Sequence, residues 1–125
     1  MKFRYLYDYG YALHKEGRYS ESNVILMKGA SISSDPMFYN IIGKNFEAIG
    51  DYDEAERNYI HSHNMVPSRL YPYILLMEME DKRGDTKQAL SYARMALSFP
   101  VKERNMSMRD LHDRAEKYYV EHKKD

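Results

Sequence analysis

The sequence contains no cysteine, which excludes disulfide bonds and thiolate chemistry but leaves the redox compartment open. It contains no tryptophan, and its bulky side chains include 13 tyrosines and 9 methionines, which pack between helices and tolerate water at one end. It has no excess charge of either sign, since Lys plus Arg and Asp plus Glu are both 19. No overall field therefore draws the chain to nucleic acid or to an anionic membrane surface.

Long hydrophobic runs are also absent. The uncharged run Leu70–Met77 is far shorter than the ~20 apolar residues of a membrane-spanning helix. The first residues lead directly into a helical pattern and lack the apolar run and small-residue cleavage site of a secretory signal. We expect a soluble segment that does not insert into a membrane, and its 125 residues with 43% hydrophobic content predict one domain with a continuous core.

Motifs with catalytic or metal-binding chemistry are missing too. No Gly-rich phosphate loop, nucleophile elbow or His-Glu-x-x-His string occurs. His61 and His63 are two residues apart on a predicted helix, so their side chains diverge by about 200° and cannot share a metal ion. Asp51, Asp53 and Glu54 lack the glycine and the twelfth-position glutamate of a calcium loop. We predict no metal, no cofactor and no catalytic residue.

A repeat of about thirty-four residues organises the chain. Similar strings begin at Gly17, Gly50 and Gly84, at spacings of 33 and 34 residues. Each glycine follows one amphipathic segment and precedes another, which is typical of a helix end where a left-handed backbone costs least. The period therefore predicts three helix-turn-helix units.

The second unit has the most complete pattern. Tyr39, Ile42 and Phe46 share one face of a first helix, at i, i+3 and i+7. Gly43 and Ala55 lack bulk where the two helices of the pair must approach closely. We expect these helices near residues 36–48 and 53–65.

The other two units depart from this pattern. The first keeps Gly10 at the close contact and has the small Ser22 in place of an apolar residue. In the third, Met77 replaces the small residue and Glu80 replaces the aromatic one. We therefore expect the third helix pair to be splayed or partly exposed.

After Pro100, a final helix is expected to close the array. Ser107-x-x-Asp110 resembles a capping box that opens this helix. Its packing face would carry Met108, Leu111, Ala115 and Tyr118 or Tyr119. Its outer face would carry Arg109, Asp113, Glu116 and Lys117. Because acidic and basic residues alternate here, a stripe for nucleic acid is not expected.

Across roughly residues 3 to 100, these offsets resemble the tetratricopeptide repeat (TPR) family. The resemblance implies an all-α fold, an α-solenoid of three TPR helix-turn-helix units plus a C-terminal capping helix, about seven helices in all. The expected repeats are 3–34, 36–67 and 69–100, and the expected capping helix is 107–122. For function, the family implies binding of a protein or peptide rather than catalysis.

In such an array the first helix of each unit lines a concave groove, and residues beside the packing stripe are the default contact set. Asn40 and Lys44, one turn apart, would hold a carboxylate or an extended peptide backbone. Tyr7 and Tyr11 would form an aromatic wall beside them. The pattern departs from the TPR clamp that grips peptide C-termini, which uses Lys, Asn or Arg at several of these positions. The candidate partner-binding residues are Arg4, Tyr7, Tyr11, His14, Met37, Asn40, Lys44, Glu47, Tyr71, Ile74, Glu78 and Asp81.

A narrower resemblance is carried by five strings: 6–10 (LYDYG), 17–23 (GRYSESN), 33–37 (SSDPM), 43–45 (GKN) and 69–73 (RLYPY). Together they resemble the soluble C-terminal repeat tail of Bacteroidetes O-antigen ligase or polymerase-type membrane proteins. This resemblance implies a bacterial domain tethered to the inner membrane through a region upstream of Met1. The periplasmic or cytoplasmic side stays open.

The leading hypothesis is a non-catalytic scaffold that recruits a protein or peptide partner to a glycan ligase or polymerase. One alternative is a homo-oligomerisation module, in which the closing helix or the third unit supplies a homodimer surface. A remote alternative is a small hydrolase that uses His14 with neighbouring acids.

Overall fold

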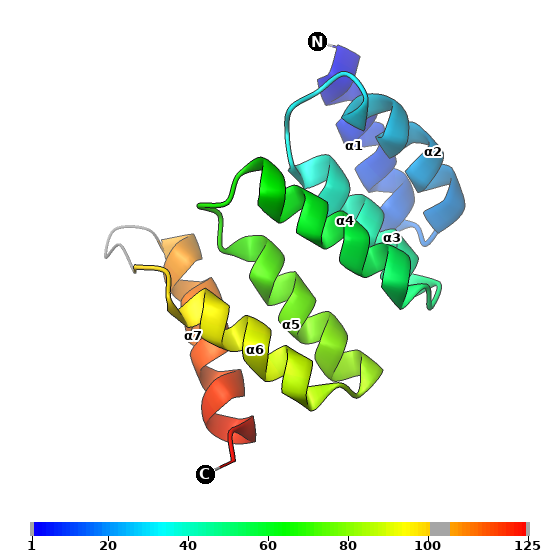
Figure 1. The fold of residues 1–125 in the computed structure, drawn as a ribbon. Coiled ribbons are helices and arrows are strands. Elements are labelled where there is room, and N and C mark those ends of the chain that lie inside the picture. The colour runs from blue at the N-terminus through cyan, green and yellow to red at the C-terminus, as the bar shows by residue number, and fades with distance from the viewer. Residues whose placement is uncertain (1, 101–105, 125) are drawn as a thin grey trace. The chain divides into compact units, whose positions relative to one another are not determined.

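A computed structural model describes residues 2–100 and 106–124. Within these residues the structure consists of seven α-helices and contains no strand, which confirms the predicted all-α class (Figure 1). The helices are α1 (Lys2–Lys15), α2 (Tyr19–Ala30), α3 (Met37–Ala48), α4 (Tyr52–Met65), α5 (Tyr71–Arg83), α6 (Thr86–Leu97) and α7 (Met106–His122). None of these described helices is long and apolar enough to span a membrane.

The chain divides into two compact units, Met1–Val66 and Pro67–Asp125. Unit 1 contains the antiparallel pairs α1–α2 and α3–α4, and α2 also packs against α3 (Figure 1). Its buried core cluster consists of Leu26, Phe38, Ile41 and Ile42. Unit 2 contains the pair α5–α6 and the final helix α7. The expectation of a single domain stays a prediction.

Glycines end three helical segments in the left-handed conformation that the repeat pattern predicts. Gly17, Gly50 and Gly84 have φ angles of 78°, 86° and 92°. Other residues adopt this region only at a cost, so glycine at the repeat period sets the turn between the two helices of each pair.

Glycines also allow the close approach expected within the first two pairs. A Cβ atom on Gly10 would lie 2.4 Å from Leu26, and one on Gly43 would lie 2.5 Å from the Tyr59 ring. In the first pair the buried Ser22 hydroxyl donates a hydrogen bond to the Gly10 carbonyl at 2.6 Å. Serine is therefore small enough here and also binds the facing backbone.

The expectation that the third pair would be splayed or partly exposed was wrong at the positions that prompted it. Met77 and Glu80 are only 2% and 1% exposed. The partner helix α6 carries small buried residues, among them Ala89, Ala93 and Ala96, which leave room for a large residue on α5. Glu80 is buried beside Arg83, with 3.5 Å between the Arg83 Nε and Glu80 Oε1 atoms.

The final helix carries the predicted packing face. Ala115 and Tyr118 are buried, whereas the predicted outer residues Arg109, Asp113, Glu116 and Lys117 are exposed. The described part of α7 includes both Met106 and Ser107, within one residue of the predicted start at 107. Residues 101–105, which precede it, lie outside the described residues.

Candidate functional site

The predicted partner-binding residues come from the first helix of each pair. Four lie on α1, four on α3 and four on α5, so two sets belong to unit 1 and one belongs to unit 2. The α1 set is Arg4, Tyr7, Tyr11 and His14. The α3 set is Met37, Asn40, Lys44 and Glu47. The α5 set is Tyr71, Ile74, Glu78 and Asp81.

The α1 set forms a row of rings along the helix. Tyr7 and Tyr11 are stacked with their centroids 6.2 Å apart, and the His14 ring lies 6.0 Å beyond Tyr11. The spacing places these residues on one helical face, about one turn apart. Tyr7 packs edge-on against Phe38 of α3 at 5.4 Å, while Tyr11 is 39% exposed. The row is therefore anchored in the core at one end and open to solvent at Tyr11.

A buried polar network fixes the other end of the row. The Oδ1 atom of Asn45 lies 2.7 Å from His14 Nδ1, and its Nδ2 group donates to Ser22 Oγ and Asn23 Oδ1 at 2.9 and 2.8 Å. Since both amide N–H groups are directed to α2, the amide oxygen accepts from His14, and the ring carries its proton on Nδ1. The network joins α1, α2 and α3.

This network does not contain the acid that the hydrolase alternative paired with His14. His14 Nδ1 binds a buried amide oxygen, whereas a catalytic histidine of the expected kind would bind a carboxylate that orients and charges it. The role of His14 in the structure is to hold the ring row against the three helices.

Two predicted contact residues are buried and cannot meet a partner at the surface. Asn40 on α3 is 2% exposed, and its amide Nδ2 lies 3.3 Å from the Met37 sulfur. Ile74 on α5 is fully buried. The expectation that Asn40 would hold a carboxylate was wrong because α3 packs against α1, α2 and α4, which cover more of its circumference than helical phase alone predicts.

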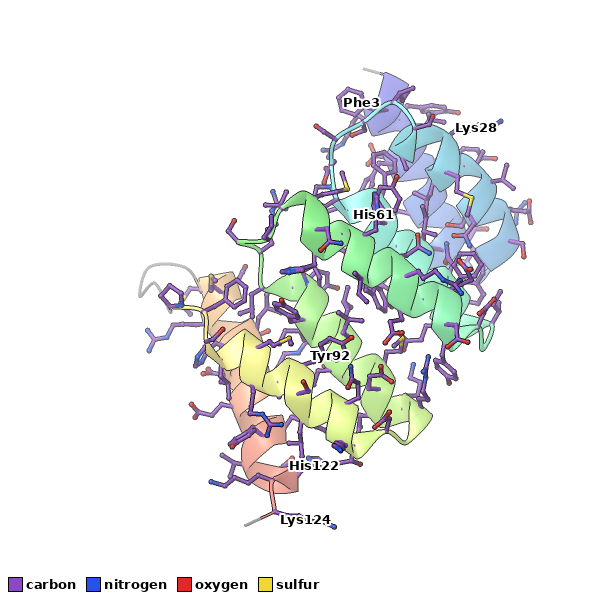
Figure 2. The ribbon with its side chains drawn as sticks, viewed as in Figure 1. Phe3, Lys28, His61, Tyr92, His122 and Lys124 are labelled. Atoms are coloured by element: carbon purple, nitrogen blue, oxygen red, sulfur yellow. The ribbon has the colours of Figure 1, made fainter. Side chains whose placement is uncertain are left out.

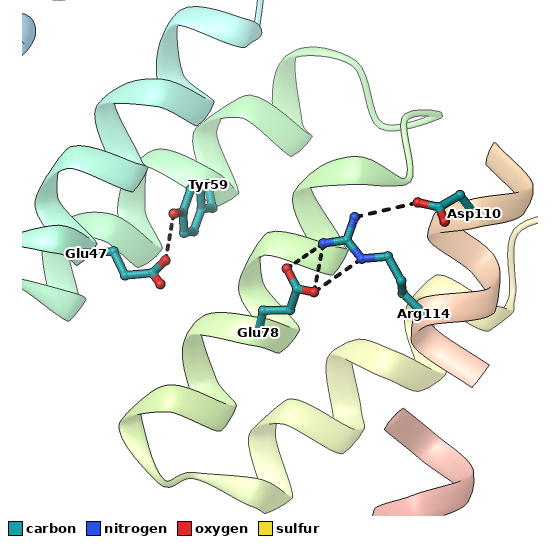
Figure 3. A network of polar contacts seen from close by, with 5 residues as sticks. All are labelled: Glu47, Tyr59, Glu78, Asp110 and Arg114. Carbon is teal, nitrogen blue, oxygen red and sulfur yellow. Dashed lines mark hydrogen bonds and ion pairs between the residues drawn. The ribbon is translucent and has the colours of Figure 1, made fainter. Parts of the chain in front are cut away.

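The remaining α3 residues are half-buried at the edge of this surface. Glu47 Oε1 accepts a hydrogen bond from the Tyr59 hydroxyl of α4 at 2.8 Å (Figure 3). Met37 and Lys44 are also half-buried. We define the α1–α3 face by the predicted residues of unit 1 that reach solvent: Arg4, Tyr7, Tyr11, His14, Met37, Lys44 and Glu47.

In unit 2 the predicted acids of α5 are bound by α7. Arg114 makes a forked contact with Glu78, with its Nη2 atom 2.7 Å from both carboxylate oxygens, and it also lies 3.9 Å from Asp110 (Figure 3). The hydrogen bond to Glu78, opposed by partial burial, raises the pKa of Arg114. Because both partners are about 40% exposed, this pair orients the helices more than it stabilises them.

The second link to α7 is a buried tyrosine. The Tyr118 hydroxyl donates to Asp81 Oδ1 at 2.9 Å. Burial, together with the adjacent Asp81 carboxylate, raises the pKa of Tyr118 to about 12. Tyr71, the remaining α5 candidate, lines an open hollow with Met106 and Leu111 of α7. Glu78, Asp81 and Tyr71 of the α5 set thus lie beside the chain's own final helix.

Sequence reasoning missed the buried polar residues Ser22, Asn23 and Asn45 as a connected group. Polar side chains are expected at the surface, and nothing in the helical period marks which of them meet across three helices. It also placed Glu78 and Asp81 in an open groove, because their partners Arg114 and Tyr118 lie 36 and 37 residues away in the chain.

The described residues contain no group of three or more His, Cys, Asp or Glu side chains that could hold a metal ion. The ring centroid of His61, which is labelled in Figure 2, lies 4.1 Å from the ring centroid of Tyr39. This contact gives His61 a packing role within the α3–α4 pair.

No protein-family model matches the chain, and no curated protein matches its sequence. Several solved structures match its fold. The type III secretion chaperone SycD of Yersinia enterocolitica, in complex with a peptide of the translocator YopD, has a TM-score of 0.84 at 17% identity, covering 96% of this chain and 91% of that one. PcrH, in complex with the chaperone-binding region of PopD, has a TM-score of 0.82 at 17% identity, covering 96% and 90%.

A plant protein of the same architecture is similar as well. The TPR domain of Arabidopsis OM64 has a TM-score of 0.70 at 14% identity, covering 93% of this chain and 95% of that one. At these identities the likeness concerns the fold alone. Together with the helical pairs and their glycine turns, it shows that this chain has a tetratricopeptide-like fold.

Proposed function

We propose that the chain is a non-catalytic scaffold that binds an extended segment of a partner protein on the α1–α3 face of unit 1. The observation that carries this proposal is the Tyr7–Tyr11–His14 row, which is held in place by Phe38 and Asn45 and is solvent-exposed at Tyr11. Rigid aromatic side chains supply contact area at low entropic cost, and pre-organised residues dominate binding energy.

The chemistry of the face suits a peptide. Its rings and Met37 offer apolar contacts, while Lys44, Glu47 and His14 offer charge and hydrogen bonds at intervals of about one helical turn. Two proteins of similar fold, SycD and PcrH, are seen in complex with peptide segments of translocator proteins. Their example supports a peptide ligand here, without identifying which one.

The test is to select peptides from a displayed random library on the immobilised chain and to measure their affinity for matched variants. Tyr11→Ala/Lys44→Ala changes the α1–α3 face while leaving the Tyr7–Phe38 contact and the buried Asn40 side chain in place. Tyr5→Ala/Lys28→Ala removes the same residue types from exposed positions elsewhere on unit 1. We expect the face variant to bind at least about tenfold more weakly, and the control variant to bind within about twofold of the parent. Equal affinity of the face variant and the parent would contradict the proposal.

A finer form of this proposal places the scaffold at the soluble end of a membrane-bound O-antigen ligase or polymerase-type protein. It is supported by the five strings at 6–10, 17–23, 33–37, 43–45 and 69–73. Recruitment of a partner to such a glycan enzyme would explain why the segment binds without catalysing. Reading the gene upstream of Met1 tests this, since the proposal requires encoded membrane-spanning segments and an open frame lacking them would contradict it.

Self-association is a second candidate function, favoured by exposed apolar residues on α7. Met106 is 75% exposed and Val120 is 60% exposed. A homodimer would cover such side chains. Light scattering over a wide concentration range tests self-association, because a molecular mass that stays at the monomer value at high concentration excludes a homodimer.

A further inference from the structure

A second hollow lies in unit 2, between α6 and the end of α7. It has a volume of about 500 Å³ and is lined by Lys87, Leu90 and Arg94 on one side and by Tyr119, Lys123 and Lys124 on the other. This volume falls within the range of small-molecule pockets. The hollow shares no residue with the α1–α3 face and is independent of the proposed function.

The charged side chains among the described lining residues of this hollow are all basic. Four of the described lining residues, Lys87, Arg94, Lys123 and Lys124, are cations, and none of the described lining residues is acidic, although the whole chain balances 19 basic against 19 acidic residues. Within the described part of the chain, none of these four cations forms an ion pair with a carboxylate. Like charges gathered in a concave site raise the local concentration of anions.

The hydrogen-bonding groups of the lining residues indicate which class of anion fits the hollow. The described lining residues offer ammonium, guanidinium and hydroxyl donors, and none of them carries a carboxylate or a carboxamide. At the end of α7, His122 stacks on Tyr118 at 3.9 Å, and its Nδ1 donates to the Tyr118 carbonyl at 2.9 Å. The oxygens of a phosphoryl group accept hydrogen bonds and so match these donors.

The walls add an apolar component to this site. Leu90 and Tyr119 are half-buried, and the Lys123 ammonium lies 5.6 Å from the Tyr119 ring centroid. A ligand with a carbon body or a planar ring would therefore contact these walls while its charged end meets the cations. His122 and Lys124 mark this end of α7 in Figure 2.

We propose that the α6–α7 hollow binds a phosphorylated small organic molecule. Its phosphoryl group is held by Lys87, Arg94 and the Lys123–Lys124 pair, and its carbon body lies against Leu90 and Tyr119. Arg94 supplies a forked contact for the phosphate, and the lysines supply compact charges.

The test is calorimetric titration of the whole chain at low ionic strength with two probes, inorganic pyrophosphate and adenosine diphosphate. We expect saturable binding of both probes. Adenosine diphosphate should bind more tightly than pyrophosphate, because its planar adenine ring adds contacts with the apolar walls. Lys87→Gln/Arg94→Gln should lower the affinity for both probes by at least about tenfold. Tyr119→Ala should weaken the binding of adenosine diphosphate, while the affinity for pyrophosphate should stay within about twofold of the parent value.

The matched control is Lys28→Gln/Arg69→Gln, which removes one lysine and one arginine from exposed positions outside the hollow. It should bind both probes like the parent, and circular dichroism should show all variants folded. Absence of saturable binding would overturn the proposal. So would an equal loss in the control variant, or tighter binding of an oligoglutamate peptide than of adenosine diphosphate.

Discussion

At the scale of single residues, unit 1 depends on a buried amide. Asn45 is fully buried and uses its oxygen and both amide hydrogens to join α1, α2 and α3. A buried polar group of this kind stabilises little when satisfied, but its removal leaves its partners without hydrogen bonds.

We predict that Asn45→Ala lowers the free energy of unfolding by about 2–3 kcal/mol, because Asn23 then loses its buried donor. Asn64→Ala, at an exposed position near the end of α4, should change it by less than about 0.5 kcal/mol. Urea denaturation followed by circular dichroism measures both values. A similar, small effect for both substitutions would show that the network contributes no stability.

Residue roles were predictable where steric size decides them. Gly43 was expected at a close helix contact, and the Tyr59 ring leaves no room there for a Cβ atom. They were less predictable where the number of neighbouring helices decides exposure. Helical phase gives the direction of Asn40 and Ile74 but not how many helices cover that direction, and both side chains are buried.

At the scale of elements, each helix pair combines a large residue on one helix with a small residue at the corresponding position of the other helix. The large residue can be on either helix. The residue sixteen positions after the close-contact position is large in the first two pairs, Leu26 facing Gly10 and Tyr59 facing Gly43. In the third pair the same positions hold Met77 and Ala93, both buried. The large residue of this pair is on its first helix, and both positions are buried rather than exposed.

This inversion predicts coupling between Met77 and Ala93. Ala93→Leu should cost about 1–3 kcal/mol through overpacking, and Met77→Ala about 2–5 kcal/mol through a cavity. The double variant should be more stable than the sum of the single effects by at least about 1 kcal/mol, because leucine fills the vacated space. Additive effects in urea denaturation would contradict the inversion.

The link between α5 and α7 gives the stability of unit 2 a pH dependence at alkaline pH. The pKa of Tyr118 is about 12 in the folded chain and about 10 in an unfolded one, so the folded state holds its proton more tightly. The resulting stabilisation is fully present below pH 10 and is lost as pH rises from about 10 to about 12.

We predict that the stability difference between the parent and Tyr118→Phe narrows over that pH interval, because phenylalanine has no phenol to titrate. Urea denaturation at a series of pH values from 9 upward measures this difference. A constant difference up to the highest pH at which the chain folds would contradict the raised pKa.

Helices and their glycine ends were predictable because local periodicity and backbone conformation decide them, and predicted segments such as 36–48 lie close to the observed α3. The polar links of α7 were not predictable, because contacts across 36 or 37 residues leave no mark in a single sequence.

At the scale of the whole molecule, the tetratricopeptide-like fold presents two different candidate surfaces. The α1–α3 face of unit 1 combines aromatic and polar groups, whereas the α6–α7 hollow of unit 2 is dominated by cations. The residues of α5 that were expected to extend the first surface are instead bound by α7 or buried. The repeat pattern predicted the fold, while the distribution of contacts decides which helices remain available to a partner.

The most direct test of peptide binding by the α1–α3 face is to titrate the isotope-labelled chain with a library-selected peptide and to follow its backbone and side-chain NMR signals. We predict that the largest shifts occur in α1 and α3, with Tyr11, His14 and Lys44 among the most affected residues. Shifts confined to α2, to α4 or to unit 2 would contradict this account.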